Sequence, residues 1–253
     1  MSETSTKPMA IVLAAGKGTR MKSDLPKVLC RVLERPLVHY VLDALRAAGV
    51  GKIIVVVGYK ADLVRAALQD YEDLEFVEQT EQLGTGHAVM VCRQQIKDFH
   101  GPVFIVAGDS PMLQAASLSK LVEHYHAANS VCMLGTLLHD NPQGLGRIVR
   151  DAEGKFTGIT EHKDCTEEQL AINEVNMSTY LIDCQHLLSG LQDINQQNSQ
   201  SEYYITDVPG ILIARGEDVR AEPVLQACEA LSVNTVDQLQ DVEKAMKNMA
   251  GHA

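Results

Sequence analysis

The stretch LAAGKGTRMKSDLPKVL, Leu13 to Leu29, decides how the rest of the chain is interpreted. It follows directly on Met9–Val12, a short apolar run that is typical of a buried strand. Behind that run come two glycines and several cations, with few apolar residues among them. A turn of this kind brings bare backbone N–H groups and positive charge to the end of a strand. The composition favours a loop that binds an anion.

The glycines Gly16 and Gly18 do not identify the anion by themselves. The segment AAGKGTR lacks the GxxxxGK[ST] spacing of a P-loop and contains only the first part of GxGxxG. Taken alone, the two glycines fit a tight strand-to-helix turn equally well. Arg20 and Lys27 favour phosphate, because a guanidinium fork and an ammonium point charge both pair with phosphate oxygens.

The bulk composition narrows the classes of partner. The formal net charge of the 253 residues is -11, which argues against binding to nucleic acid because the phosphate backbone would be repelled. No apolar stretch approaches the roughly 20 residues that a membrane helix needs, and Met1–Lys7 lacks the pattern of a secretion signal. We therefore expect a cytoplasmic protein, without nucleic-acid or membrane partners, that captures any anionic ligand locally.

The cysteines point to no metal centre. All six are widely scattered, and neither a CxxC pair nor a Cys/His zinc spacing occurs. Several of them lie within apolar periodic segments. We expect buried free thiols rather than disulfides or metal ligands.

The first half of the chain alternates between two kinds of apolar pattern. Strand-like runs occur at Met9–Leu13, Lys52–Val57, Leu74–Val77 and Val103–Val106, and helical patterns at Pro36–Ala48, Ala61–Gln69 and Thr85–Asp98. Alternating strands and helices with fully apolar strands predict an α/β fold whose mainly parallel sheet is covered on both faces. In such a doubly wound sheet, ligands bind outside the carboxyl ends of the strands.

The second half follows a different pattern. The runs Arg147–Arg150 and Lys155–Thr160 flank DAEG like the strands of a hairpin, and Met177–Asp183 alternates like a strand of a mixed sheet. These elements predict a smaller lobe that faces the substrate.

The ends of the chain lead to a division into three parts. We expect a disordered tail at residues 1–8, one principal domain at residues 9–235 and a C-terminal helix at residues 236–253. An apolar stripe at helical spacing would pack this last helix on the domain or on a partner, and its members are Val236, Leu239, Val242 and Met246.

A carboxylate follows the strand-like run at Val103–Val106. The segment VFIVAGDSPM leads from that run directly into Gly108 and Asp109. An aspartate at the carboxyl end of such a strand commonly holds Mg²⁺ against substrate phosphates. The alternative is an aspartate that caps the following helix. Together with the cationic loop, Asp109 favours the metal role.

Six further motifs follow the loop in order along the chain. They are EQTEQLGTGHA (78–88), GLGRIVRD (144–151), ITEHKDCTEEQ (159–169), NEVNMSTYLID (173–183), SEYYITD (201–207) and SVNTVDQL (232–239). With these motifs, the chain resembles the bacterial N-acetylglucosamine-1-phosphate uridylyltransferases from about residue 10 to the final helix. The order of the motifs is far more specific than any one of them.

The resemblance implies a fold and an activity. It implies a Rossmann-like nucleotidyltransferase fold with a small sugar-binding lobe, which joins UTP and a sugar 1-phosphate with Mg²⁺ and releases pyrophosphate. In that family this domain precedes a β-helix of hexapeptide repeats that carries an acetyltransferase. No such repeats occur here, so we expect a single activity. The oligomeric state stays open between a monomer and a weak homo-oligomer.

The resemblance also assigns roles to individual residues. The nucleotide-binding set is Leu13, Ala14, Ala15, Gly16, Gly18, Lys27, Gln79, Gly84 and Thr85. The sugar-binding set is Gly108, Gly146, Glu161, Asn176 and Asn234. The metal ligands are Asp109 and Asn234, and the catalytic residues are Arg20, Lys27 and Asp109.

Four of these residues have an ordinary alternative when they are taken one at a time. Gln79 could be a surface residue, Gly146 a hairpin turn, Glu161 a solvated charge and Asn176 a strand-edge cap. Their side chains also suit the assigned roles. A glutamine amide can pair with the edge of uracil, and a carboxylate or an amide can bind sugar hydroxyls or an acetamido group.

The mechanism that the resemblance implies is an in-line attack by the sugar phosphate oxygen on the α-phosphorus of UTP. No protein nucleophile is required. Catalysis then consists of positioning and of charge stabilisation by Mg²⁺, Arg20 and Lys27. His87, in GTGHA, is expected to be structural because the reaction needs little proton transfer.

Two departures from the family pattern affect the sugar side. Ala107 stands where the family usually has an aromatic residue, and Met177-Ser178 stand where it usually has Thr-Gly. We expect a reshaped sugar pocket, so other sugar 1-phosphates such as glucose 1-phosphate, or another nucleotide, stay open. A non-catalytic nucleotide-sugar sensor is a further alternative, although a sensor has less use for a complete metal and phosphate set.

Overall fold

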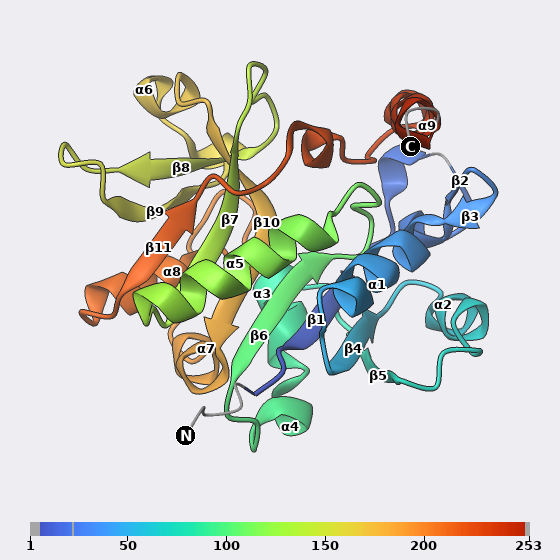
Figure 1. Cartoon of the computed structure of the whole chain (residues 1–253), viewed down its shortest axis with the longest axis horizontal. Coiled ribbons are helices and arrows are strands. Elements are labelled where there is room, and N and C mark those ends of the chain that lie inside the picture. The colour runs from blue at the N-terminus through green and yellow to red at the C-terminus, as the bar shows by residue number, and fades with distance from the viewer. Residues whose placement is uncertain (1–5, 22, 251–253) are drawn as a thin grey trace.

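A mixed sheet forms the centre of the computed structural model, which describes residues 6–21 and 23–250 (Figure 1). Within these residues the sheet has nine strands, and its main path runs in the order β11-β7-β10-β6-β1-β4-β5. The strands of this path are β1 (Met9–Ala14), β4 (Lys52–Val57), β5 (Leu74–Glu78), β6 (Pro102–Ala107), β7 (Cys132–Leu138), β10 (Glu174–Asp183) and β11 (Val219–Glu222).

The strand directions confirm the predicted fold class. β1 is parallel to both of its neighbours, β4 and β6, and β5 is parallel to β4. β10 is antiparallel to β6 and to β7, whereas β11 is parallel to β7. Along the main path β10 is therefore the strand that runs against the others, and the sheet is mixed but mainly parallel. The four strands predicted for the first half are all present, each within one residue of its expected bounds.

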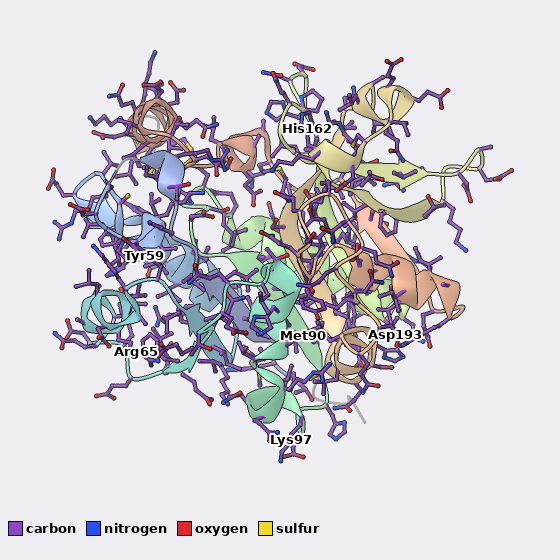
Figure 2. The ribbon with its side chains drawn as sticks, turned by 180° about the vertical axis from the view of Figure 1, so that it is seen from behind. Tyr59, Arg65, Met90, Lys97, His162 and Asp193 are labelled. Carbon is purple, nitrogen blue, oxygen red and sulfur yellow. The ribbon has the colours of Figure 1, made fainter. Side chains whose placement is uncertain are left out.

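Helices cover both faces of the sheet, as expected for strands that are apolar throughout. Along β1, Ala10 and Val12 face a core that includes α1 (Leu37–Ala47), α2 (Ala61–Ala67) and α5 (Ala115–Ala128). Met9 and Ile11 face a second core that includes α3 (Thr85–Met90), α4 (Arg93–Ile96), α7 (Cys184–Gly190) and α8 (Asp207–Ala214). Figure 1 shows α1 and α5 in front of the sheet, and Figure 2 shows α3 with Met90 on the opposite face.

One predicted helix is wrong in its continuity. The pattern at Thr85–Asp98 predicts a single helix, but the structure has α3 and α4 with a tight turn between them. In this turn the Cys92 N–H donates to the carbonyl of Val89, three residues earlier, at 3.0 Å. The turn keeps Val89, Cys92 and Ile96 fully buried against the sheet. Packing therefore decides the geometry here, and the periodic pattern does not reveal the break.

The predicted hairpin is present and forms a lobe at one side of β10. It consists of β8 (Gly146–Arg150) and β9 (Phe156–Thr160), which are antiparallel. The short helix α6 (Glu167–Leu170) follows and begins with a capping box at Thr166. β8 joins the sheet through β10, which starts earlier than predicted and has a register shift between Asn176 and Thr179.

The last helix, α9 (Val236–Ala250), packs on the body of the protein beside β2 (Arg31–Val32) (Figure 1). Val242 is fully buried, and Leu239 and Met246 pack against the same cluster. The expected apolar stripe is wrong in one member, because Val236 is 45% exposed. Val233, just before the helix, occupies this cluster instead and is fully buried.

Other expectations concern the N-terminus and the cysteines. Residues 1–5 of the expected tail lie outside the described residues, whereas Pro8 is buried and its carbonyl accepts the Gly51 N–H at 2.8 Å. All six cysteines are free, as expected, but Cys165 and Cys228 are only partly buried. Burial raises the pKa of the Cys92 thiol to about 12. In the part of the chain that the structure describes, no helix is long and apolar enough to cross a membrane.

A truncation in the central strand should test this core. Ile105 of β6 is fully buried and lies between Ile11 and Tyr180 on the neighbouring strands. We expect Ile105→Ala to lower the free energy of unfolding by about 2–5 kcal/mol, because the lost methyl groups leave a cavity. Leu138→Ala is the control, since Leu138 is 64% exposed and should change stability by less than about 0.5 kcal/mol. Equal losses in urea unfolding would contradict the assigned core.

Candidate active site

The glycine loop, which contains Gly16 and Gly18, lies where the sheet changes winding direction. From β1 the chain continues to β4 on one side and later returns to β6 on the other, so the carboxyl end of β1 is a topological switch point. The Ala15 carbonyl accepts the Tyr59 N–H at 3.0 Å, which ties the start of the loop to the end of β4. No heavy atom would lie within 4 Å of a Cβ added at Gly16, so the backbone there is open to a ligand.

Gly18 is required by the position of Lys27. Its φ of +64° lies in the left-handed region, and a Cβ at this position would lie 2.5 Å from the Lys27 Cβ. The lysine stem therefore packs directly on the loop backbone. Lys27 begins the short helix η2 (Lys27–Leu29), in which Val28 and Leu29 are buried. These contacts direct the ammonium group toward the carboxyl ends of β1 and β6.

Four predicted residues meet at this ammonium group. Lys27 Nζ lies 2.5 Å from Asp109 Oδ2 and donates to Asn234 Oδ1 at 2.7 Å. Arg20 Nη2 donates to the same Asn234 oxygen at 2.9 Å. The glycine loop, the end of β6 and the segment before α9 thus converge on one point. The structure brings together the residues predicted for phosphate and for metal.

The donor set at this point suits a hard divalent cation. A carboxylate and an amide oxygen are ligands that Mg²⁺ accepts, usually with substrate phosphates completing its shell. The described residues contain no group of three or more His, Cys, Asp or Glu side chains that could hold a metal ion by themselves. Asp109 and Asn234 therefore fit an ion that arrives with a phosphate ligand.

Gln79 lines a cavity that the glycine loop, Lys27 and Asp109 also line. It is only 3% exposed, so it is not a surface residue. Its Nε2 donates to the Gly84 carbonyl at 3.0 Å and lies 3.1 Å from His87 Nδ1. These two contacts orient the amide, and the structural role expected for His87 stays a prediction.

The segment around Gly84 is tied to a distant part of the chain. Gly84 has a φ of +107°, and a Cβ there would lie 2.5 Å from the Tyr203 carbonyl. The Gly86 N–H donates to that carbonyl at 2.7 Å, and the Ile205 N–H donates to Thr85 Oγ1 at 3.1 Å. These bonds bring the motif SEYYITD to the edge of the cavity.

The cavity has a volume of about 520 Å³ and is lined by most of the predicted site residues. Those that line it are Leu13, Ala14, Ala15, Gly16, Gly18, Arg20, Lys27, Gln79, Gly84, Thr85, Asp109 and Glu161. The nucleotide-binding set predicted from the sequence is thus gathered around a single space.

Four predicted residues are not among those that line the cavity. The Gly108 N–H donates to the Leu13 carbonyl at 2.9 Å, and Gly146 pairs with Asn176 between β8 and β10. Asn176 is buried, and its Nδ2 donates to the Tyr180 hydroxyl at 2.7 Å. Asn234 reaches the site through its bonds to the two cations. Their contacts with a sugar stay a prediction.

Several residues at the cavity were not predicted. The clearest are Thr206, whose hydroxyl donates to Glu161 Oε1 at 3.3 Å, and Tyr180, which stands in front of Asn176. Others are Lys17, Gln82, Glu202 and Ile205. Glu202, Ile205 and Thr206 belong to SEYYITD, and this motif is the signal in the sequence that could have found them.

Glu161 is not a freely solvated charge. Burial raises the pKa of its carboxyl, and the negative charges of Asp164, Asp207 and Glu202 raise this pKa further. The hydrogen bond from Thr206 acts in the opposite direction. A half-buried carboxylate at a cavity wall is suited to accept hydrogen bonds from ligand hydroxyl or amide groups.

The two departures from the family pattern fall in different surroundings. Ala107 and Ser178 line the cavity, and Ser178 has a φ of +53° at the register shift of β10. Met177 instead packs with Leu137 and Val175 in a small cluster on the other side of the strand. The expectation that both members of Met177-Ser178 reshape the pocket is therefore wrong for Met177, because successive side chains of a strand point to opposite faces.

Comparison with known proteins identifies the domain. The sequence profile of the MobA-like NTP transferase domain matches residues 10–157, which include β1, the glycine loop and Asp109. The chain belongs to this family. The match covers the glycine loop, whose bare backbone and cations were predicted to bind phosphate.

Longer relatives extend the match. The bifunctional protein GlmU of Streptococcus agalactiae serotype V is 42% identical over 239 residues, which cover 94% of this chain and 52% of that protein. GlmU of Geobacillus sp. (strain WCH70) is 41% identical over 241 residues, with 95% and 52% covered. The NTP transferase chain thus spans about half the length of these curated relatives.

A solved structure supports the fold of this NTP transferase. The crystal structure of a UDP-glucose pyrophosphorylase complexed with UDP-glucose superposes with a TM-score of 0.76. It shares 16% sequence identity and covers 96% of this chain and 100% of the other. The predicted Rossmann-like nucleotidyltransferase fold is confirmed.

The raised pKa of Glu161 leads to a prediction about stability and pH. A carboxyl whose folded pKa is raised costs stability when it is ionised, so its contribution is lost as the pH rises through that pKa. We expect Glu161→Gln to unfold at a higher temperature than the parent protein at pH 7.5. This difference should shrink toward pH 4.5, the ordinary value for the group.

Thermal unfolding across this pH range measures the effect. Glu168→Gln is the matched control, because Glu168 lies exposed on α6 in the same lobe and should show no such pH-dependent gain. A parent protein more stable than the Glu161→Gln variant at pH 7.5 would contradict the prediction.

Proposed function

We propose that this NTP transferase joins UTP and N-acetylglucosamine 1-phosphate, forming UDP-N-acetylglucosamine and pyrophosphate. The observation that carries the proposal is the convergence of Asp109 and Asn234 on Lys27, beside a glycine loop and an oriented glutamine. This is the arrangement needed to grip a metal-bound triphosphate next to a base pocket. The similarity to the GlmU proteins supports it. A reaction that uses UTP belongs in the cytoplasm, which is the proposed compartment.

The base and the phosphates would occupy different parts of the cavity. Gln79 and the backbone at Gly84 would pair with the edge of uracil, since an amide oxygen accepts from an imide N–H. The triphosphate would lie along the loop at Gly16 and Gly18, with Arg20 and Lys27 on its oxygens. These two side chains supply positive charge at the loop, although the net charge of the whole chain is -11.

The chemical step would depend on positioning and charge. Asp109 and Asn234 would hold Mg²⁺, which supplies positive charge to the phosphate oxygens when it is bound. The sugar phosphate oxygen would attack the α-phosphorus in line, and pyrophosphate would leave. Arg20 and Lys27 would stabilise the negative charge that shifts toward pyrophosphate, and no side chain of this protein would form a covalent bond with the substrate.

The sugar would lie toward the lobe formed by β8 and β9. Glu161 and Thr206 would bind its hydroxyl or acetamido groups directly, while Asn176 would act through Tyr180. Ala107 and Ser178 leave small side chains at this end of the cavity. Small side chains favour the bulkier N-acetylated sugar over a plain hexose.

A panel of substrates tests the proposal. The chain is incubated with Mg²⁺, UTP or CTP, and either N-acetylglucosamine 1-phosphate or glucose 1-phosphate, and pyrophosphate release is followed. We expect the fastest release with UTP and the N-acetylated sugar. Reaction of glucose 1-phosphate alone would overturn the sugar assignment. Binding of a UDP-sugar without transfer at any Mg²⁺ concentration would favour a non-catalytic sensor.

Removing one metal ligand should abolish most of the turnover. We expect Asp109→Ala to lower kcat by about 10²- to 10³-fold, because the cation loses its carboxylate while the fold keeps its buried core. Initial rates of pyrophosphate release at saturating substrates measure this loss. Asp24→Ala is the control, since Asp24 lies exposed in the same loop region and should leave the rate within about twofold. A rate unchanged by Asp109→Ala would remove Asp109 from the mechanism.

A further inference from the structure

A buried carboxylate that the proposed mechanism does not use lies close to the site. Glu229 is 6% exposed and belongs to the short helix η4 (Ala227–Ala230), in the segment that connects β11 to α9 (Figure 1). Its Oε2 accepts the Gln226 N–H at 2.7 Å and the Ser117 hydroxyl at 2.5 Å. Its Oε1 accepts the Gln114 N–H at 3.0 Å.

These partners belong to two segments far apart in the sequence. Gln226 lies in the same turn as Glu229, whereas Gln114 and Ser117 form the start of the 14-residue helix α5. Burial raises the pKa of Glu229, and the three hydrogen bonds oppose that effect. A buried carboxylate is tolerated when its oxygens are satisfied in this way. Glu229 therefore fastens the segment before α9 to the beginning of α5.

The two fastened segments are the ones that carry the metal ligands. Asp109 precedes Gln114 by five positions, and Asn234 follows Glu229 by five positions. The Leu113 N–H donates to the Ser110 carbonyl at 3.2 Å, so the first connection is a compact turn.

The second connection is equally constrained. The Leu231 N–H donates to the Cys228 carbonyl at 3.1 Å, and Val233 is fully buried. Val233 shares one hydrophobic cluster with Met112 from the first connection. The two connections thus pack against each other between the Glu229 bonds at one end and Lys27 at the other.

We propose that Glu229 is a positioning residue that sets the separation of Asp109 and Asn234, so that their oxygens face one cation. This inference rests on the proposed function where the cation is Mg²⁺ with a nucleotide. Because the linking segments are short and packed, a shift at Glu229 is transmitted to both oxygens. A metal site tolerates little displacement, and loss of such supporting bonds commonly weakens metal binding by about 10- to 100-fold.

The test uses Glu229→Gln, which keeps the shape of the side chain. Its amide NH₂ group would face a donor whose hydrogen bond the carboxylate now accepts. Mn²⁺ binding in the presence of UTP is measured by electron paramagnetic resonance. We expect the affinity for Mn²⁺ to fall by about tenfold or more, while UTP binding without a divalent ion stays within about twofold of the parent protein. Turnover at limiting Mg²⁺ should fall and recover as the Mg²⁺ concentration is raised.

Asp183→Asn is the matched control. Asp183 is also a carboxylate that caps a helix, since it accepts the Gln185 and His186 N–H groups at the start of α7. It lies at the opposite end of β10 from Asn176, away from the cavity. We expect this variant to lose thermal stability without any change in Mn²⁺ affinity. If Glu229→Gln behaves in the same way, the positioning role is overturned.

A second measurement requires no ligand and separates this inference from the proposed function. Unfolding free energies are determined for Glu229→Gln, Lys27→Met and the double variant. We expect non-additive effects, because Glu229 acts on the oxygens that Lys27 holds. Additive effects would overturn the proposal whether or not the chain turns over UTP. Should Glu229→Gln fail to fold, Ser117→Ala removes one of the three bonds and is used in the same cycle, with the same outcomes.

Discussion

The rest of the site depends on one interaction, in which the ammonium group of Lys27 contacts both Asp109 and Asn234. Its two oxygen partners come from the end of the central strand β6 and from the segment before the last helix. Each oxygen alone is an ordinary polar group. Held together around the Lys27 ammonium, they form one polar cluster, and the open backbone of the glycine loop lies beside it.

The fold supplies this contact through several independent constraints. The switch point at β1 places the loop at the carboxyl edge of the sheet, and the positive φ of Gly18 allows the Lys27 stem to pack on it. On the opposite side, Glu229 ties the two segments that carry the oxygens. The segment around Gln79 is held in the same manner, since the hydrogen bond from the Gly86 N–H to the Tyr203 carbonyl joins two distant motifs. Several segments of the site are thus held by contacts with a second part of the chain.

The same site carries a cost in stability. Glu161 is half-buried near other carboxylates, and its pKa is raised rather than lowered. A protein selected for stability alone would place an amide or an apolar residue there. Retaining the carboxylate makes sense if a ligand hydroxyl or amide completes its hydrogen bonds, which is the role proposed for it on the sugar side.

The sequence by itself determined the α/β class, the four strands of the first half, and the loop and strand-end aspartate that mark the ligand edge. These features have local causes, namely apolar runs, glycine positions and charges next to a strand. Sequence motifs also led to Gln79 and Asn234, although only by resemblance. Tertiary structure alone decided the break between α3 and α4, the turning of Met177 away from the cavity, and the hydrogen bonds of Thr206 and Glu229. Each of these depends on which distant segments pack together, and no local pattern of residues encodes that choice.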